Sequence, residues 1–247
     1  VLFFAGDLAG ARRELESARA RLEELAAEFF REDLSLALGW LELEAGDLEA
    51  ARARAREVAA TDGGAAHEPL WAAERLWLEA EILASEGETD AALERLDRAR
   101  TTFEGSSQRQ RAAEAALASA EIELSSSSPE RAADLAREAA DRHRRFLALT
   151  PTWPAASAVW ARALLAAGRL EEARAAFAPV GEAAARSESV LHRWAVAIDE
   201  ALLVAAAGEL ATARNRLIRV AGESAAAGYV ATSRRAAAVL SSLENPR

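Results

Sequence analysis

The sequence predicts an all-α protein built from repeated helical hairpins, and three observations support this prediction. About a quarter of the 247 residues are Ala, the residue with the highest helix propensity. Similar turn sequences recur at a spacing of about 40 residues. The segments between these turns place apolar residues three and four positions apart, as amphipathic helices do.

The repeated turn is clearest as G-D-L-x-x-A-R, which occurs at residues 6–12 and again at 46–52. Weaker copies begin at Gly87, Gly168 and Gly208. A copy without glycine lies at 125–132. Glycine can adopt a positive φ and so end one helix, while Asp, Glu or Thr directly after it favours the start of the next. Each copy therefore predicts a reversal of the chain between two antiparallel helices.

The predicted helices follow from these turns and from shorter breaks between the hairpins. They are expected at residues 8–30, 32–45, 47–60, 68–86, 89–103, 108–124, 130–147, 154–167, 169–186, 188–207, 209–227 and 230–243. We expect a single solenoid domain over 1–247, with an incomplete first repeat at 1–30 and a capping helix at 230–243. Because the sequence begins inside a hairpin, we also expect it to be a fragment of a longer chain.

Composition excludes several functions. The chain has no Cys, so disulfides and Cys-ligated metals are excluded. Its formal net charge is −10 and every basic residue is Arg. Such a chain is repelled by nucleic acid and by anionic lipid, so neither nucleic acid nor a membrane is an expected partner. The predicted localisation is cytoplasmic.

No catalytic constellation is apparent in the sequence. His67, His143 and His192 fall on different repeats, without the spacing of metal ligands. The segment 222–226 lacks the final Gly of the G-x-S-x-G nucleophile motif. Acidic pairs such as Glu42 with Glu44 are expected to be solvated. We therefore expect no catalytic, cofactor or metal site, and predict that the protein is not an enzyme.

The repeats resemble the tetratricopeptide repeat (TPR) family, in which small residues precede and follow the turn glycine. The matching positions are Gly39, Gly46 and Ala51; Ala80, Gly87, Ala92, Leu96 and Ala99; and Ala161, Gly168, Ala173 and Phe177. The resemblance implies a right-handed superhelix of five to six repeats that serves as a protein-interaction scaffold. The period of about 40 residues exceeds the usual 34 and overlaps that of HEAT and armadillo repeats, which remain alternatives.

The family register also implies which side chains line the concave groove. They are Trp40, Trp77, Glu81, Glu121 and Arg162. A groove that offers Trp and mixed charges suits an extended peptide or a helix. The alternative is that Trp40 and Trp77 only seal neighbouring repeats. Trp160 is expected to lie in the core.

Three functions remain open at this point. The first is a scaffold that binds a peptide or protein partner through the groove. The second follows from a resemblance to the long-repeat arms of bacterial signalling proteins: a regulatory arm that acts on a kinase, regulatory ATPase or caspase-like domain of the same chain. The third is self-association through the N-terminal end, where Leu2, Phe3, Phe4 and Leu8 are expected to be uncovered.

Overall fold

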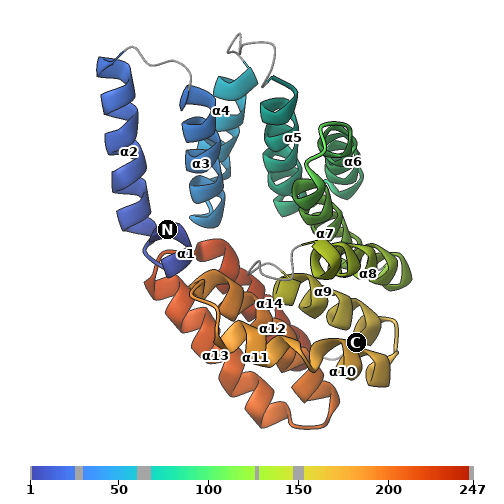
Figure 1. The fold of residues 1–247 in the computed structure, drawn as a ribbon. Coiled ribbons are helices and arrows are strands. Elements are labelled where there is room, and N and C mark those ends of the chain that lie inside the picture. Colours follow the sequence, from blue (N-terminus) through green and yellow to red (C-terminus); the bar gives the residue numbers. More distant parts are fainter. Residues whose placement is uncertain (1, 26–29, 60–67, 126–127, 147–152, 245–247) are drawn as a thin grey trace. The chain divides into compact units, whose positions relative to one another are not determined.

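The computed structural model describes all residues except 1, 26–29, 60–67, 126–127, 147–152 and 245–247 (Figure 1). The described residues are α-helical and contain no strand, which confirms the predicted all-α class. The chain divides into two compact units: unit 1 comprises residues 1–3 and 7–115, and unit 2 comprises residues 4–6 and 116–247. The prediction of one solenoid domain over 1–247 stays a prediction.

The helices follow the predicted order. Unit 1 contains α2 (Leu8–Glu24), α3 (Arg31–Glu44), α4 (Leu48–Ala59), α5 (Glu68–Ser85) and α6 (Thr89–Gly105). The short α1 (Leu2–Ala5) and the long α7 (Arg109–Ser125) each contribute to both units. Unit 2 contains α8 (Pro129–Phe146), α9 (Trp153–Ala166), α10 (Leu170–Phe177), α11 (Val180–Ala185), α12 (Val190–Ala206), α13 (Leu210–Ala226) and α14 (Val230–Glu244).

The predicted glycine turns form as expected. Gly46, Gly87, Gly168 and Gly208 have φ between 76° and 90°. At Gly46 the amide donates to the carbonyl of Leu43 at 3.0 Å, and the amide of Asp47 donates to that of Glu42 at 2.9 Å. This pair of bonds is the Schellman motif, and it satisfies carbonyls that the end of a helix would otherwise leave without partners.

Among these turns, the residue directly after the glycine caps the next helix with its side chain where it is Asp, but not where it is Glu. The Asp7 carboxylate accepts a hydrogen bond from the amide of Gly10 at 2.7 Å, and that of Asp47 accepts one from Ala50 at 3.0 Å. Glu88 and Glu209 precede α6 and α13 without a side-chain cap. Between α6 and α7, Ser107 rather than Gly105 takes the positive φ, at 60°.

Small residues let neighbouring helices of unit 1 pack closely. A buried cluster joins α3, α4 and α5, and it consists of Leu36, Ala51, Ala55, Val58, Leu78 and Ile82. A Cβ at Gly39 would lie 2.5 Å from Cδ2 of Leu78, so only glycine fits there without movement of the neighbour. Packing against Leu78 therefore favours glycine at the small position that the repeat pattern assigns to Gly39.

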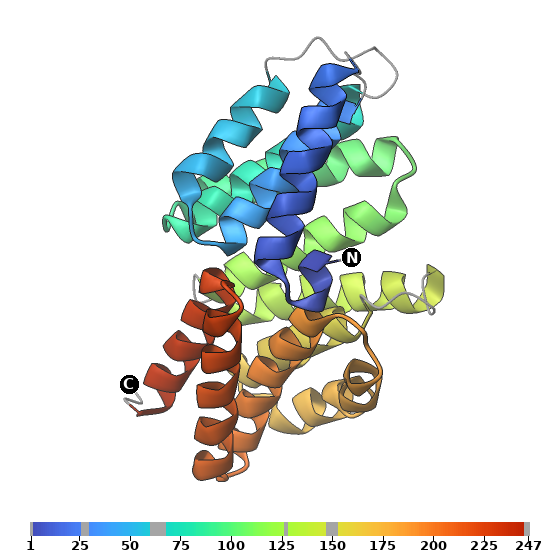
Figure 2. The same cartoon turned by 90° about the vertical axis from the view of Figure 1, so that its left-hand side faces the viewer.

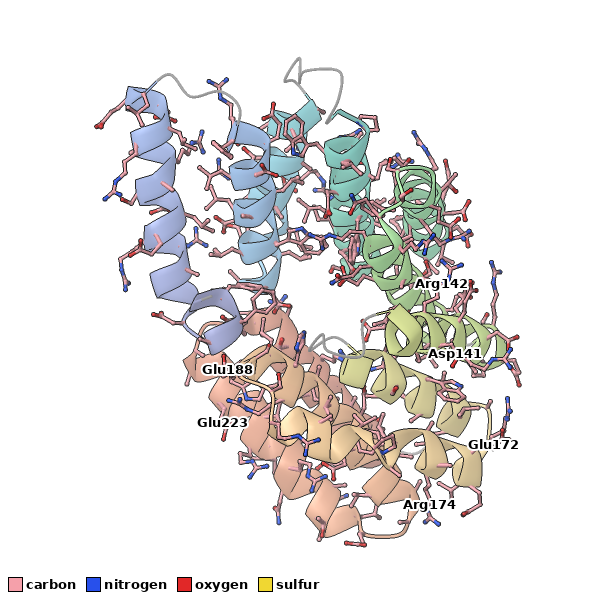
Figure 3. All side chains as sticks on the ribbon, in the orientation of Figure 1. Asp141, Arg142, Glu172, Arg174, Glu188 and Glu223 are labelled. Atoms are coloured by element: carbon pink, nitrogen blue, oxygen red, sulfur yellow. The ribbon has the colours of Figure 1, made fainter. Side chains whose placement is uncertain are left out.

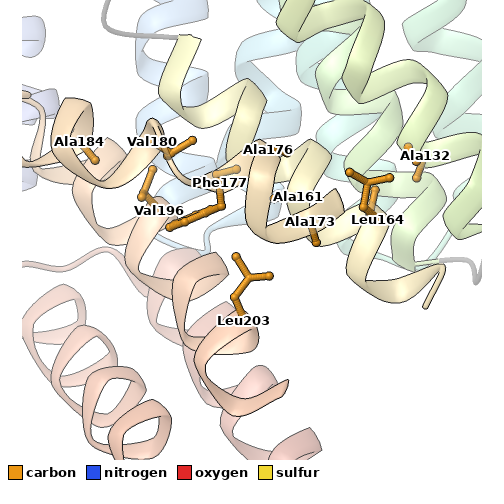
Figure 4. Close-up of a cluster of buried hydrophobic side chains, with 13 residues drawn as sticks. Ala132, Ala161, Leu164, Ala173, Ala176, Phe177, Val180, Ala184, Val196 and Leu203 are labelled. Carbon is orange, nitrogen blue, oxygen red and sulfur yellow. The ribbon is translucent and has the colours of Figure 1, made fainter. Parts of the chain in front are cut away.

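Unit 2 has a core of its own in which alanine is again prominent (Figure 4). Phe177 of α10 and Val196 and Leu203 of α12 supply larger side chains to this core. Trp160 packs against two buried clusters, in agreement with its predicted core position. In Figure 2 the chain reverses between α12 and α13 and again between α13 and α14, so α13 runs antiparallel to both of its neighbours, as the repeated turns require.

Several local predictions are wrong. The helix expected at 169–186 is two helices, α10 and α11, because Pro179 has no amide to continue the first. The helix expected at 8–30 ends at Glu24, and residues 26–29 lie outside the described residues. Leu8, which was expected at an uncovered end, is only 7% exposed, whereas Phe4 is 50% exposed. Val1 and the side chain of Leu2 are not described.

Glu42 is also not solvated as expected. Its side chain is 4% exposed and lies on α3 opposite Arg12 of α2. The two guanidinium nitrogens of Arg12 donate to its two carboxylate oxygens, each at 2.6 Å. A bidentate pair of this kind compensates a buried carboxylate better than a single contact does. It ties the edge helix α2 to its neighbour.

Candidate functional site

The five residues predicted to bind a partner all lie on the first helices of hairpins. Trp40 of α3 and Trp77 and Glu81 of α5 belong to unit 1. Glu121 of α7 and Arg162 of α9 belong to unit 2. The structure therefore gives two separate sets of candidate residues.

In unit 1 the two tryptophans contact each other. The rings of Trp40 and Trp77 meet edge to face, with centroids 5.5 Å apart and planes at 80°. Trp77 also meets the buried ring of Phe103 at 6.4 Å, and its Nε1 donates to Oε1 of Glu81 at 3.2 Å. Both indoles are half-buried, and Trp40 packs against the core of unit 1. They therefore seal neighbouring repeats and also present part of their surface to solvent.

Charged residues that the sequence did not single out lie beside Trp77. Nε of Arg111 on α7 lies 2.8 Å from Oε1 of Glu74, and its Nη1 lies 3.2 Å from Oε2 of Glu114. The Arg111 guanidinium also stands 5.9 Å from the centroid of the Trp77 ring. We call the surface formed by these side chains the aromatic–acidic face; its members are Asp33, Trp40, Glu74, Trp77, Glu81, Arg111 and Glu114.

The environment of Glu74 disfavours its charged form. Burial raises the pKa of Glu74, attraction to Arg111 lowers it, and repulsion from Glu114 and Asp33 raises it again. The net effect is a pKa above the ordinary value of 4.5. The attraction of Arg111 therefore does not fully offset the effects of burial and of the two neighbouring carboxylates on Glu74.

In unit 2, Glu121 and Arg162 belong to a network of four charged side chains. Arg162 donates from Nη1 to Oδ1 of Asp199 at 2.8 Å and from Nη2 to Oε1 of Glu121 at 3.2 Å. Arg235 of α14 donates from Nη2 to the same Oδ1 of Asp199 at 3.1 Å. Its Nη1 lies 3.5 Å from Oε1 of Glu121. Two cations and two anions thus alternate across α7, α9, α12 and α14, and we call them the charge square.

The charge square differs from the aromatic–acidic face in its balance of positive and negative charge. The Asp199 side chain is 2% exposed and that of Arg162 is 15% exposed, whereas Glu121 is 39% exposed. Burial raises the pKa of Glu121, but attraction to Arg235 and Arg162 and the hydrogen bond from Arg162 outweigh it, so the pKa lies below its ordinary value. Here the carboxylate is favoured in its charged form, and the four side chains satisfy one another.

The structure also shows the surroundings of some side chains that could be reactive or bind a metal. Ser224, the serine of the incomplete nucleophile motif, is fully buried and donates to the carbonyl of Val220 at 2.7 Å. His67 and the side chain of His143 lie outside the described residues. Among the described residues, no three His, Asp or Glu side chains gather closely enough to hold a metal ion. Within the same residues, every helix is too short or too polar to cross a membrane.

The order of helices and turns defines the class of the protein as an all-α solenoid of helical hairpins. No protein-family model matches the sequence, and no curated protein is detectably similar to it. Solved structures do share the fold. The apo form of RapI matches with a TM-score of 0.59 at 13% identity, over 98% of this chain and 96% of that one.

Two further Rap structures are similar. A Rap protein complexed with competence and sporulation factor has a TM-score of 0.66 at 12% identity, over 93% of this chain and 68% of that one. Aspartyl phosphate phosphatase F from Bacillus subtilis has a TM-score of 0.63 at 13% identity, over 98% and 68%. Rap proteins are TPR-like helical-repeat proteins. At these identities the likeness shows the fold, and the fold predicted from the TPR resemblance is confirmed at that level.

Proposed function

We propose that this protein binds a protein or peptide partner through the aromatic–acidic face of unit 1. The observation that carries the proposal is the half-buried pair Trp40 and Trp77, whose rings meet at 5.5 Å on adjacent first helices. Tryptophan and arginine are the side chains most enriched among residues that dominate binding energy. The similar Rap protein complexed with competence and sporulation factor supports the use of such a fold in binding.

Unit 2 is a weaker candidate for the same role. Glu121 and Arg162 were predicted to bind a partner, but each is engaged by charged neighbours within the charge square. A partner would have to separate those ion pairs, two of which involve the buried carboxylate of Asp199. For this reason we assign the primary binding surface to unit 1. A partner role for Glu121 and Arg162 stays a prediction.

The test is a selection of displayed random peptides on the full chain, followed by anisotropy titration of the selected peptides. Trp77→Ala should weaken their binding about tenfold or more, the size of an interface hot spot. Leu210→Ala is the matched control, because it removes an exposed apolar side chain from α13 in unit 2. Its effect should stay within about twofold.

Circular dichroism separates loss of binding from loss of fold. Trp77→Ala should retain its helix content and its cooperative thermal unfolding. If it does not, Trp77→Phe serves instead, since it keeps a ring against Phe103 and removes the indole. Selected peptides that bind a folded Trp77 variant as tightly as the original chain would contradict the proposed site.

A further inference from the structure

The aromatic–acidic face carries a row of carboxylates at equivalent positions of three successive first helices. Asp33 of α3 and Glu74 of α5 are separated by 41 residues, and Glu74 and Glu114 of α7 by 40. These spacings match the repeat, so the hairpin stacking of unit 1 places the three acids in one row. The repulsion that Glu74 feels from both Asp33 and Glu114 is consistent with that arrangement.

The molecule itself shows how this row holds a positive charge. The Arg111 guanidinium lies between Glu74 and Glu114, within 2.8 Å and 3.2 Å of their oxygens, and faces the Trp77 ring. Two carboxylates and an aromatic ring are the chemistry that recognises a guanidinium. The Arg111 side chain is 48% exposed, so an incoming group can approach it or displace it.

The electrostatic balance indicates that the face accepts more positive charge. In spite of its ion pair with Arg111, Glu74 remains disfavoured as a carboxylate, first because it is buried and also because Glu114 and Asp33 repel it. The Asp33 carboxylate accepts a hydrogen bond from the indole of Trp71 at 3.1 Å, which is a neutral donor and leaves the negative charge in place. A cation bound along the row therefore relieves a repulsion that the folded chain carries on its own.

We propose that the partner of the aromatic–acidic face is a basic peptide segment, which lays Arg or Lys side chains along Asp33, Glu74 and Glu114 beside the indole rings. This inference rests on the proposed function, because it names the chemistry of the partner at the same surface. An acidic segment would meet three carboxylates of its own sign, and a purely apolar one would leave them desolvated.

The probe is a short labelled peptide in which Arg alternates with Ser, titrated against the full chain by fluorescence anisotropy. The comparison peptides replace Arg with citrulline, which keeps the shape and removes the charge, or with Glu. The Arg peptide should bind about tenfold more tightly than either, and added salt should weaken it. Equal affinity for the Arg and citrulline peptides would overturn the proposal.

Two substitutions in the face have opposite expected effects. Glu74→Gln should weaken the Arg peptide about tenfold, since it removes the central charge of the row. Arg111→Gln should strengthen it roughly threefold or more, because it frees the Trp77 ring and removes a competing cation. A generally damaged fold would weaken binding in both variants, so the opposite signs of the two effects distinguish the proposed site from damage.

Glu172→Gln is the matched control for net charge. Glu172 lies on α10 of unit 2, is paired with Arg169, and points away from the packed helices near Arg174 (Figure 3). Its substitution removes the same charge and should leave binding unchanged within about twofold. If Glu172→Gln weakened binding as much as Glu74→Gln, the attraction would be one of net charge and the proposed site would be wrong.

The selection experiment separates this inference from the proposed function. Selected peptides that are neutral or acidic, yet depend on Trp77, would overturn the basic partner and leave the binding site intact. Selected peptides that are enriched in Arg or Lys and lose affinity in Glu74→Gln would support both. Peptides that bind independently of Trp77 and Glu74 would overturn both.

Discussion

The carboxylates Glu74 and Glu121 lie in repeats of similar sequence but in opposite electrostatic environments. Burial raises the pKa of Glu74, repulsion from Glu114 and Asp33 adds to that effect, and Arg111, which Glu74 shares with Glu114, offsets it only in part. Glu121 meets both Arg162 and Arg235, so its pKa is lowered. The first arrangement leaves negative charge for a partner to compensate. The second stabilises the folded chain.

Glu121 should therefore contribute to the pH dependence of stability. Because its pKa in the folded chain lies below the unfolded value of 4.5, its contribution is present above that pH and is lost as the pH falls through the folded pKa. Glu121→Gln should lower the free energy of unfolding by about 1 kcal/mol at pH 7, a modest effect because the side chain is 39% exposed. Urea unfolding at several pH values should show this difference shrink below pH 4.5. A constant difference down to low pH would contradict the assignment.

Sequence reasoning identified some of these residues and missed others for a physical reason. Trp40 and Trp77 could be found because each stands at a position of the first helix that the TPR register assigns to the groove. Arg111 and Asp199 could not, since their contacts depend on how helices about 40 residues apart approach one another. The repeat offered one unused signal, the recurrence of an acid at residues 33, 74 and 114.

At the level of helices and turns, the pattern of glycine and alanine predicted most of the structure. Gly46, Gly87, Gly168 and Gly208 end helices at positive φ, as their position in the repeat indicated. The predictions failed where a local effect overrode the period. Pro179 divides one predicted helix in two, because it has no amide to continue the first.

Two glycine substitutions test the turn assignment. Gly87 has φ of 86° with open space where a Cβ would stand, so Gly87→Ala should cost about 1–2 kcal/mol through backbone conformation alone. Gly222 lies inside α13, also with open space, and Gly222→Ala should stabilise by about 0.5–1 kcal/mol. Chemical denaturation measures both. Equal effects of the two substitutions would contradict the assigned turn.

At the scale of the whole molecule, the repeat of about 40 residues runs through both units. The sequence pattern alone could not predict their division, because the boundary at residues 115 and 116 falls within α7, where the helical pattern is unbroken. Each unit nevertheless builds its core from the small residues and turns that the repeat specifies. What distinguishes the units is the charge of their first helices, because α3 and α5 are rich in Asp and Glu whereas α9 and α12 are not.

Fluorine NMR of the chain labelled with 5-fluorotryptophan, titrated with the Arg peptide, tests the central claim most directly. The chain has six Trp residues, and Trp40→Phe and Trp77→Phe assign the two resonances of the face. We predict that the peptide shifts the Trp40 and Trp77 resonances and leaves those of Trp160 and Trp194 unchanged, since these pack within unit 2. Saturating peptide that shifts Trp160 or Trp194 instead, or shifts no resonance, would contradict the assignment of the binding site to unit 1.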